Sequence, residues 1–188
     1  YLEIDSPQWA HRKLLDQLRE HLEVQLEALA NRLELSYSNE DQAPLSLQDV
    51  LAKWVTANQK SNQAWLTKPI IDAYIELNKN GWAHSVEIWK DDDVIGGLYG
   101  ITIGRIFFAE SMYSDKSNAS KFAIYSLCKL THIYDFPIID CQVTSDHLKN
   151  MGAIEIPKNE FLTIVNRECS NMNKFSKWPK NLISLNKL

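Results

Sequence analysis

Residues 82–111 read "WAHSVEIWKDDDVIGGLYGITIGRIFFAES" and decide the fold of the chain. Apolar and polar side chains alternate over 82–89, 94–101 and 106–111, which is the period of a β-strand. The segments between them, "KDDD" and "TIGR", have the composition of turns. The stretch therefore predicts three consecutive antiparallel strands, a β-meander.

Helical periodicity precedes the meander. Leucines recur three or four residues apart over about 6–31, and the pattern resumes from Ser46 and again from a Thr67 cap to Asn80-Gly81. We expect residues 1–60 to form an N-terminal helical segment.

After the meander the pattern alternates between helix and strand. It predicts the following elements: a helix from about Asn118, a strand over 138–143, a short helix over 146–151, a strand over 153–156 and a helix from Lys158. Helices around a sheet of mixed direction give an α/β (α+β mixed sheet) class. The element order resembles the N-acetyltransferase fold, so we expect residues 61–188 to be an acetyltransferase-like domain with a basic C-terminal tail.

The charge is unevenly distributed. The chain of 188 residues has a net charge of −4, residues 1–50 carry four Lys/Arg against ten Asp/Glu, and residues 158–188 carry six against two. A basic tail can contact nucleic acid phosphates even in an acidic protein. The alternative is a tail that is simply solvated.

Three cysteines, Cys128, Cys141 and Cys169, are odd in number and lack CxxC spacing. This pattern argues against a disulfide framework and against a zinc site, and it is typical of a reducing cytoplasm. No run approaches the ~20 apolar residues of a membrane-spanning helix, and no signal-peptide pattern is present. A Cys–His nucleophile involving His84 is disfavoured, because neither Cys128 nor Cys141 lies where its pKa would fall.

The strand "IIDCQV" (138–143) contains two polar residues, Asp140 and Gln142. Residues two apart share a strand face, so we expect the carboxylate and the carboxamide side by side. They are either a functional pair or a structural loop cap.

In the acetyltransferase fold, the turn before the helix that follows the meander binds the pyrophosphate of acetyl-CoA through glycines. The matching turn here, "YSDKSNASK" (113–121), contains no glycine. Use of acetyl-CoA is therefore disfavoured.

Four stretches, "AWLTKPIIDAY", "HSVEIW", "IGGLYGITIGRIFFAESMYSDKSNASKFAI" and "IIDCQVTSDHLKNMGAIEI", resemble the leucyl/phenylalanyl-tRNA–protein transferase family from about Ala64 to Leu162. The resemblance implies an aminoacyltransferase that moves Leu or Phe from aminoacyl-tRNA to the α-amino group of proteins beginning with Arg or Lys, which marks them for degradation in the N-degron pathway. It implies no CoA, metal or ATP, and hence no cofactor. The implied partners are aminoacyl-tRNA and an acceptor protein or peptide, with no membrane.

The resemblance also assigns residues. Gln142 receives a hydrogen bond from the attacking amine and Asp140 polarises Gln142, so these two form the catalytic pair. Glu110 lies beside the aminoacyl group, and a Leu/Phe pocket is lined by Phe107, Leu98, Ile124, Leu127 and Ile139. Trp65 stacks near the aminoacyl-tRNA end, and Ser145 is a further substrate-binding position, at which the family has an asparagine. The family commonly has Phe at Leu127 and Met at Leu98, so the pocket should differ in shape.

Residues 1–50 do not match the family's usual front domain. Three alternatives therefore stay open: a tRNA-dependent enzyme that acylates a small-molecule amine, a non-catalytic tRNA- or peptide-binding relative, and a CoA-dependent N-acetyltransferase.

Overall fold

The computed structural model describes residues 2–3, 51, 67–90 and 93–170. Their elements, in chain order, are β1 (Leu2–Glu3), α3 (Lys68–Lys79), β2 (Ala83–Lys90), β3 (Asp93–Ile103), β4 (Ile106–Ser114), α4 (Ala119–Ile133), β5 (Ile138–Asp140), α5 (Asp146–Lys149) and α6 (Lys158–Cys169). The predicted helix over 6–31, Trp65 and the tail beyond residue 170 lie outside the described residues. Of the helix predicted from Ser46, only Leu51 is described, and it is helical and buried.

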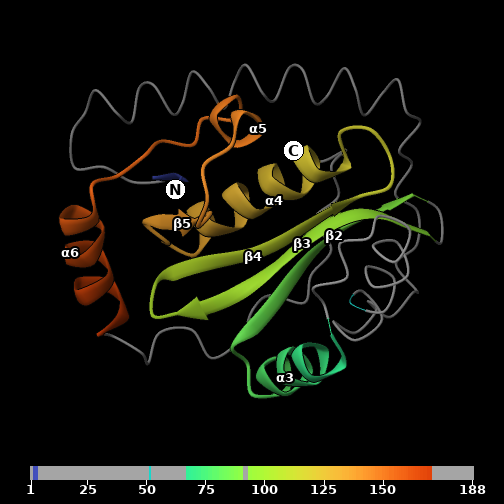
Figure 1. Ribbon diagram of the computed structural model, residues 1–188, viewed down its shortest axis with the longest axis horizontal. Helices are drawn as coiled ribbons and strands as arrows, with labels where there is room; N and C mark the ends of the chain where they lie inside the picture. The colour runs from blue at the N-terminus through green and yellow to red at the C-terminus, as the bar shows by residue number, and fades with distance from the viewer. Residues whose placement is uncertain (1, 4–50, 52–66, 91–92, 171–188) are drawn as a thin grey trace.

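The strands form one mixed sheet in the order β1-β5-β4-β3-β2 (Figure 1). The pairs β2–β3 and β3–β4 are antiparallel, as the alternation over 82–111 predicts. The chain then crosses through α4, and β5 pairs parallel to β4. Parallel neighbouring strands are usually connected by a crossover helix, because a tight turn can join only antiparallel strands. The predicted mixed α/β sheet is confirmed.

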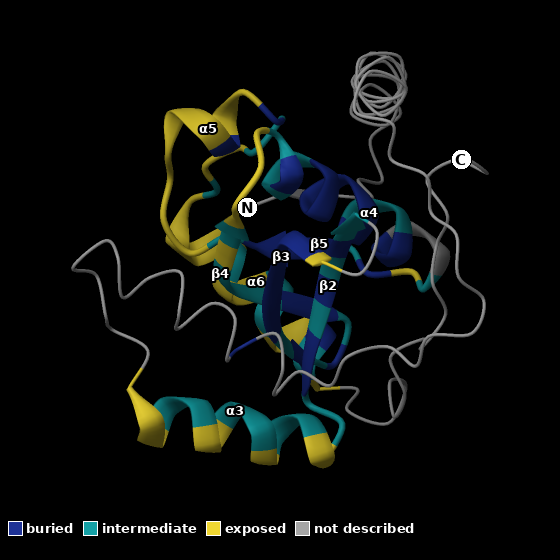
Figure 2. Cartoon of the chain, turned by 90° about the vertical axis from the view of Figure 1, so that its right-hand side faces the viewer, coloured by how far each residue is buried: buried dark blue, intermediate teal, exposed yellow. Residues whose placement is uncertain are grey.

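Helices cover both faces of the sheet (Figure 1). On one face, α4 buries Phe122, Ala123 and Leu127 against the strands in the larger core cluster. On the other face, Ile70 and Tyr74 of α3 pack around Tyr99 in a smaller cluster. Figure 2 shows β3 mostly dark between these layers, whereas the outer side of α3 and most of α5 are exposed.

The helix α3 begins and ends where its sequence predicts. Thr67 is the N-cap with an extended backbone, and a proline occupies the first turn, where a missing N–H costs nothing. Asn80 is the C-cap, and Gly81 follows with a φ of 80°, the left-handed conformation that glycine adopts without strain.

Of the two strands predicted after α4, the first is shorter than predicted and the second is not formed. The strand predicted over 138–143 ends at Asp140, because Gln142 has a φ of 60°, which no strand residue adopts. The segment 153–156 is not a strand, and its alternation does not reflect burial because Ile154 is 45% exposed. The strand β1, with only two residues, pairs antiparallel to β5 and is too short to produce a periodic pattern.

An ion pair between Arg105 and the buried Glu168 carboxylate joins the β3–β4 turn to the end of α6. The Glu168 carboxylate accepts hydrogen bonds from Arg105 Nε at 2.7 Å and from Arg167 Nε at 2.6 Å, and its side chain is 5% exposed. Gly104 has a φ of 59°, and a Cβ there would lie 2.1 Å from the Glu168 carbonyl oxygen. The turn therefore requires glycine at this position both for its conformation and for the close approach of α6.

Candidate functional site

The parallel strands β4 and β5 separate at the position where the candidate residues occur. Their register pairs Phe108 with Asp140 and stops there, whereas β4 continues to Ser114. Glu110 lies two residues past Phe108 and Gln142 two residues past Asp140, so each follows closely on the last paired residue of its strand. The carboxyl ends of parallel strands are a preferred place for ligand sites, because the chains diverge there.

A β-bulge places Glu110. The pairing of β3 with β4 runs from Gly100↔Ala109 directly to Tyr99↔Ser111, which leaves Glu110 as an extra residue in β4. Bulges bend a strand and redirect a side chain, and they are frequent beside functional sites. The Glu110 side chain is half-buried.

The chain turns sharply after Asp140. The N–H of Gln142 donates a hydrogen bond to Asp140 Oδ1 at 2.7 Å, and the N–H of Val143 donates to the Cys141 carbonyl oxygen at 2.7 Å. The second bond spans three residues around Gln142, whose φ is positive, so this is a γ-turn of the strained type. Gln142 is exposed, and Asp140 is 6% exposed.

Burial raises the pKa of the Asp140 carboxyl, whereas the hydrogen bond from the Gln142 N–H lowers that pKa and the nearby Glu110 carboxylate raises it again. The influence of Glu110 shows that the two carboxyl groups are close enough to interact electrostatically. At the end of the parallel strand pair, Asp140 is therefore linked to the Gln142 backbone by a hydrogen bond and to Glu110 by electrostatic interaction; these three residues are called the polar cluster below.

The five residues expected to line the Leu/Phe pocket lie together, but as core. Their exposed fractions are 1% for Leu98, 0% for Phe107, 6% for Ile124, 1% for Leu127 and 1% for Ile139, and all belong to the cluster beneath α4. Apolar side chains at such exposure are normally core, so their role as pocket residues stays a prediction.

Asp140 and the five apolar residues lie on opposite faces of the sheet. Ile139 belongs to the core on the α4 face, so its neighbour Asp140 points to the α3 face by the alternation of side chains.

Ser145 caps the helix α5. Its hydroxyl oxygen accepts a hydrogen bond from the Leu148 N–H at 3.2 Å and so caps the helix N-terminus. The predicted substrate-binding role of Ser145 stays a prediction, as does that of Trp65, which lies outside the described residues.

Tyr74 is a neighbour of the site that the sequence pattern did not reveal. Burial raises the pKa of its phenol, and the Glu110 carboxylate, which accepts a hydrogen bond from the phenol, raises it further. The Tyr74 and Tyr99 rings meet edge to face with centroids 4.9 Å apart. Since Tyr74 falls in the apolar stripe of α3 with Ile70 and Ile71, its spacing indicates only a core residue.

The cysteines and His84 are unsuited to nucleophilic catalysis. Burial raises the pKa of the Cys128 thiol to about 12, and it also raises the pKa of Cys141. Burial lowers the pKa of His84 to about 4, and its Nε2 lies 3.0 Å from the Thr102 hydroxyl. A neutral buried thiol is a poor nucleophile because the thiolate is the reactive form.

Within the part of the chain that the structure describes, no group of three or more His, Cys, Asp or Glu side chains could hold a metal ion. No helix in that part has the length and apolar character needed to cross a membrane.

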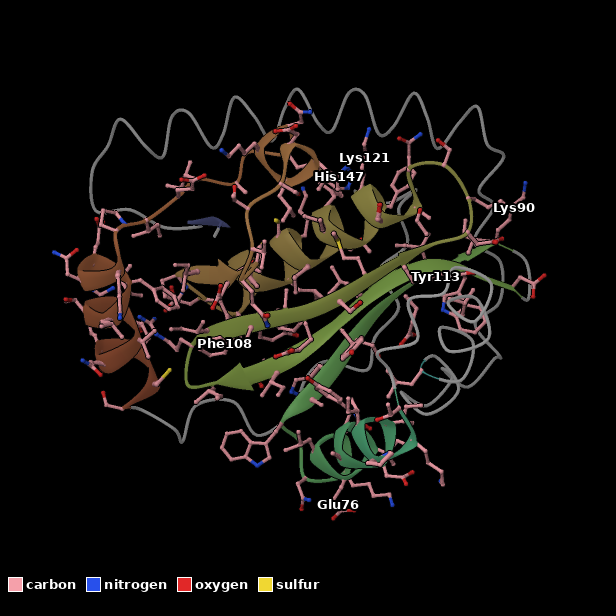
Figure 3. The ribbon with its side chains drawn as sticks, in the orientation of Figure 1. Glu76, Lys90, Phe108, Tyr113, Lys121 and His147 are labelled. Carbon is pink, nitrogen blue, oxygen red and sulfur yellow. The ribbon has the colours of Figure 1, made fainter. Side chains whose placement is uncertain are left out.

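Charge differs between the two helical layers. Figure 3 shows Lys121 of α4 and His147 of α5 on the side of the sheet opposite Glu76 of α3. The charges of α3 balance, since it has two lysines and two acidic residues, whereas α4 has Lys121 and Lys129 and no acidic residue. Basic side chains that could meet a phosphate are thus present on the α4 side.

Comparison with known proteins gives a consistent result. The family model described as leucyl/phenylalanyl-tRNA protein transferase matches residues 23–166. A leucyl/phenylalanyl-tRNA–protein transferase of Hahella chejuensis is 45% identical over 108 residues, which cover 57% of this chain and 46% of the relative. The transferase of Cellvibrio japonicus is 48% identical over 54% of this chain and 43% of the relative, and that of Legionella pneumophila is 38% identical over 71% and 60%. The chain thus spans about half the length of the curated relatives it matches.

Proposed function

The chain belongs to the leucyl/phenylalanyl-tRNA protein transferase family, and from this premise we propose that it transfers Leu or Phe from aminoacyl-tRNA to the α-amino group of proteins that begin with Arg or Lys. The observation that supports this best is the gathering of Asp140, Gln142 and Glu110 where β4 and β5 part. Such a transfer marks the acceptor protein for degradation in the N-degron pathway. The cytoplasm, where charged tRNA is made, is the compartment that this donor requires.

The reaction needs positioning more than chemical activation. An aminoacyl-tRNA is an activated ester, so attack by a neutral amine is downhill without ATP or a further cofactor. The enzyme must hold two substrates in line and stabilise the tetrahedral oxyanion. A carboxamide is a poor base, so Gln142 accepts a hydrogen bond from the attacking amine and orients it, with Asp140 acting through Gln142.

Glu110 suits the charged end of a substrate. Its carboxylate can accept hydrogen bonds from the aminoacyl amino group or from the basic N-terminus of the acceptor. The hydrogen bond from Tyr74 and the bulge in β4 fix the direction of this carboxylate. The acceptor is therefore proposed to approach from the α3 face, on which Tyr74 lies.

The donor side chain is proposed to enter from the same end of β5 toward the α4 face. There Leu98, Phe107 and Ile139, with Ile124 and Leu127 of α4, offer apolar surface that matches Leu or Phe. Since these side chains are 0–6% exposed, they must shift apart to admit the donor. The terminal adenosine and acceptor stem would lie beside the basic residues on the α4 side, with Trp65 stacking near the aminoacyl end and Ser145 lining the site beside α5.

We propose that residues 61–188 form an N-acetyltransferase-like domain and residues 1–60 an N-terminal helical segment. The meander, the crossover helix α4, the bulge in β4 and the short parallel pair support this assignment. The absence of glycine from 113–121 disfavours CoA as the donor.

A transfer assay tests the proposal. The protein is incubated with leucyl-tRNA and peptides that differ only in their first residue, and mass spectrometry detects peptides extended by Leu. Peptides beginning with Arg or Lys should be extended, and a matched peptide beginning with Glu should not. Extension that ignores the first residue would contradict the proposed acceptor, and acetylation from acetyl-CoA in place of leucylation would contradict the donor.

A further inference from the structure

The backbone at Gln142 is held in a conformation that glutamine rarely adopts. Its φ of 60° lies in the left-handed region, and the bond from Val143 N–H to the Cys141 carbonyl closes a γ-turn around it. Only asparagine, aspartate and glycine enter this region readily. A strained conformation persists only where surrounding contacts enforce it, and such positions cluster at functional sites.

Asp140 supplies the contact that enforces this turn. Its Oδ1 accepts the Gln142 N–H at 2.7 Å, so the side chain of the last strand residue closes a ring onto the backbone two residues later. The carboxylate is itself fixed, because Asp140 is 6% exposed and paired in register with Phe108 of β4. The rigid sheet therefore determines the path of the exposed chain at Gln142.

We propose that Asp140 is a positioning residue that acts through the main chain of Gln142: it holds the left-handed turn and so determines where the Gln142 carboxamide lies beyond the end of β5. The hydrogen bond runs to the backbone nitrogen of Gln142, and polarisation of the carboxamide by Asp140 is not needed for it. What the site then requires at position 140 is a hydrogen-bond acceptor at the Oδ1 position. The use of the Gln142 carboxamide in the reaction rests on the proposed function. The role of Asp140 rests on the geometry of the turn alone.

Two variants of Asp140 separate the positioning role from a role for its charge. Asp140→Asn keeps an Oδ1 acceptor and removes the charge, whereas Asp140→Ala removes both. In the leucyl transfer assay, Asp140→Ala should lower kcat by about 10²-fold, because a small misplacement of a reacting group has that effect. Asp140→Asn should keep most of the wild-type kcat, and neither variant should raise the KM for leucyl-tRNA.

Hydrogen exchange at the Gln142 amide reports the turn without any transfer assay. In the wild-type protein the amide should exchange slowly for an exposed residue, Asp140→Asn should retain that protection, and Asp140→Ala should lose it. The comparison also separates this inference from the proposed function. If the wild type transfers nothing, the proposed function fails, and exchange at Gln142 still decides whether Asp140 holds the turn.

Gln142→Gly covers the case in which Asp140→Ala does not fold. Gln142 is exposed, and glycine adopts a positive φ without strain, so this variant should raise the midpoint of thermal unfolding while losing transfer activity. The inference is overturned if Asp140→Asn loses as much kcat as Asp140→Ala, if Gln142 exchange is the same in wild type and Asp140→Ala, or if Gln142→Gly lowers the midpoint.

Discussion

Truncation of Leu98 to alanine tests both the core and the proposed donor pocket. Leu98 is 1% exposed in the cluster beneath α4, so Leu98→Ala removes fully buried atoms whose neighbours are held by the sheet. Such changes cost about 3 kcal/mol in the free energy of unfolding, within a range of about 2–5 kcal/mol. For a chain of this size the unfolding midpoint should fall by roughly 6–12 °C. Urea unfolding followed by tryptophan fluorescence measures the loss, with an unchanged m-value expected.

The same variant should change the donor preference, since the removed atoms leave space where a Leu or Phe side chain would lie. The kcat/KM ratio for phenylalanyl-tRNA over leucyl-tRNA should rise by about tenfold. Leu162→Ala is the matched control, because Leu162 is 46% exposed on α6 and its truncation should leave stability and donor preference nearly unchanged. A Leu98→Ala protein as stable as Leu162→Ala would refute the assignment of Leu98 to the core. An unchanged donor ratio in a destabilised Leu98→Ala would refute its place in the pocket.

Three further predictions concern pH, packing and salt. Burial alone would raise the pKa of Glu168, but hydrogen bonds from the arginines lower it below its usual 4.5. Glu168→Gln should therefore cost about 2 kcal/mol at pH 7 in urea unfolding. This loss should shrink as the pH falls below about 4.5, because the depressed pKa contributes stability only while the carboxylate is charged. Gly100→Ala should cost about 3 kcal/mol in the same assay, since its Cβ would lie 2.6 Å from the Phe107 ring. The basic tail over 158–188 predicts that tRNA affinity, measured by filter binding, falls about tenfold or more between roughly 50 and 200 mM salt.

Elements with long, regular patterns could be predicted from the sequence. The alternation over 82–111 specified the three antiparallel strands, and the Thr67 and Asn80-Gly81 signals specified both ends of α3. These signals are local, since strand alternation and helix caps depend on neighbouring residues. The parallel pairing of β4 with β5 is consistent with the expected mixed sheet.

The positions of the candidate residues could be predicted only in part. Apolar alternation suggested a strand through Gln142, whereas the strand stops at Asp140, because no glycine or proline marks the γ-turn that follows. The two polar side chains therefore do not share a strand face, and their contact runs from carboxylate to backbone. The bulge at Glu110 likewise has no signature in the sequence, since it depends on the register with β3.

Tyr74 shows a second limit of pattern reasoning. Its spacing in α3 is that of a core residue, and its ring does pack on Tyr99. The contact of its hydroxyl with Glu110 depends on how α3 lies across the sheet, which helical periodicity cannot specify.

The most direct test of the central claim, that the end of the parallel strand pair carries out aminoacyl transfer, is a single-turnover measurement on Gln142→Ala. The protein in excess is mixed with radiolabelled leucyl-tRNA and a peptide beginning with Arg, and the rate of peptide extension is compared with the wild type. Loss of a preorganised hydrogen-bonding group should slow the reaction by about 10²–10³-fold, with leucyl-tRNA affinity within a few-fold of the wild type. Extension by Gln142→Ala at the wild-type rate would contradict the account, because the exposed carboxamide would then take no part in the reaction.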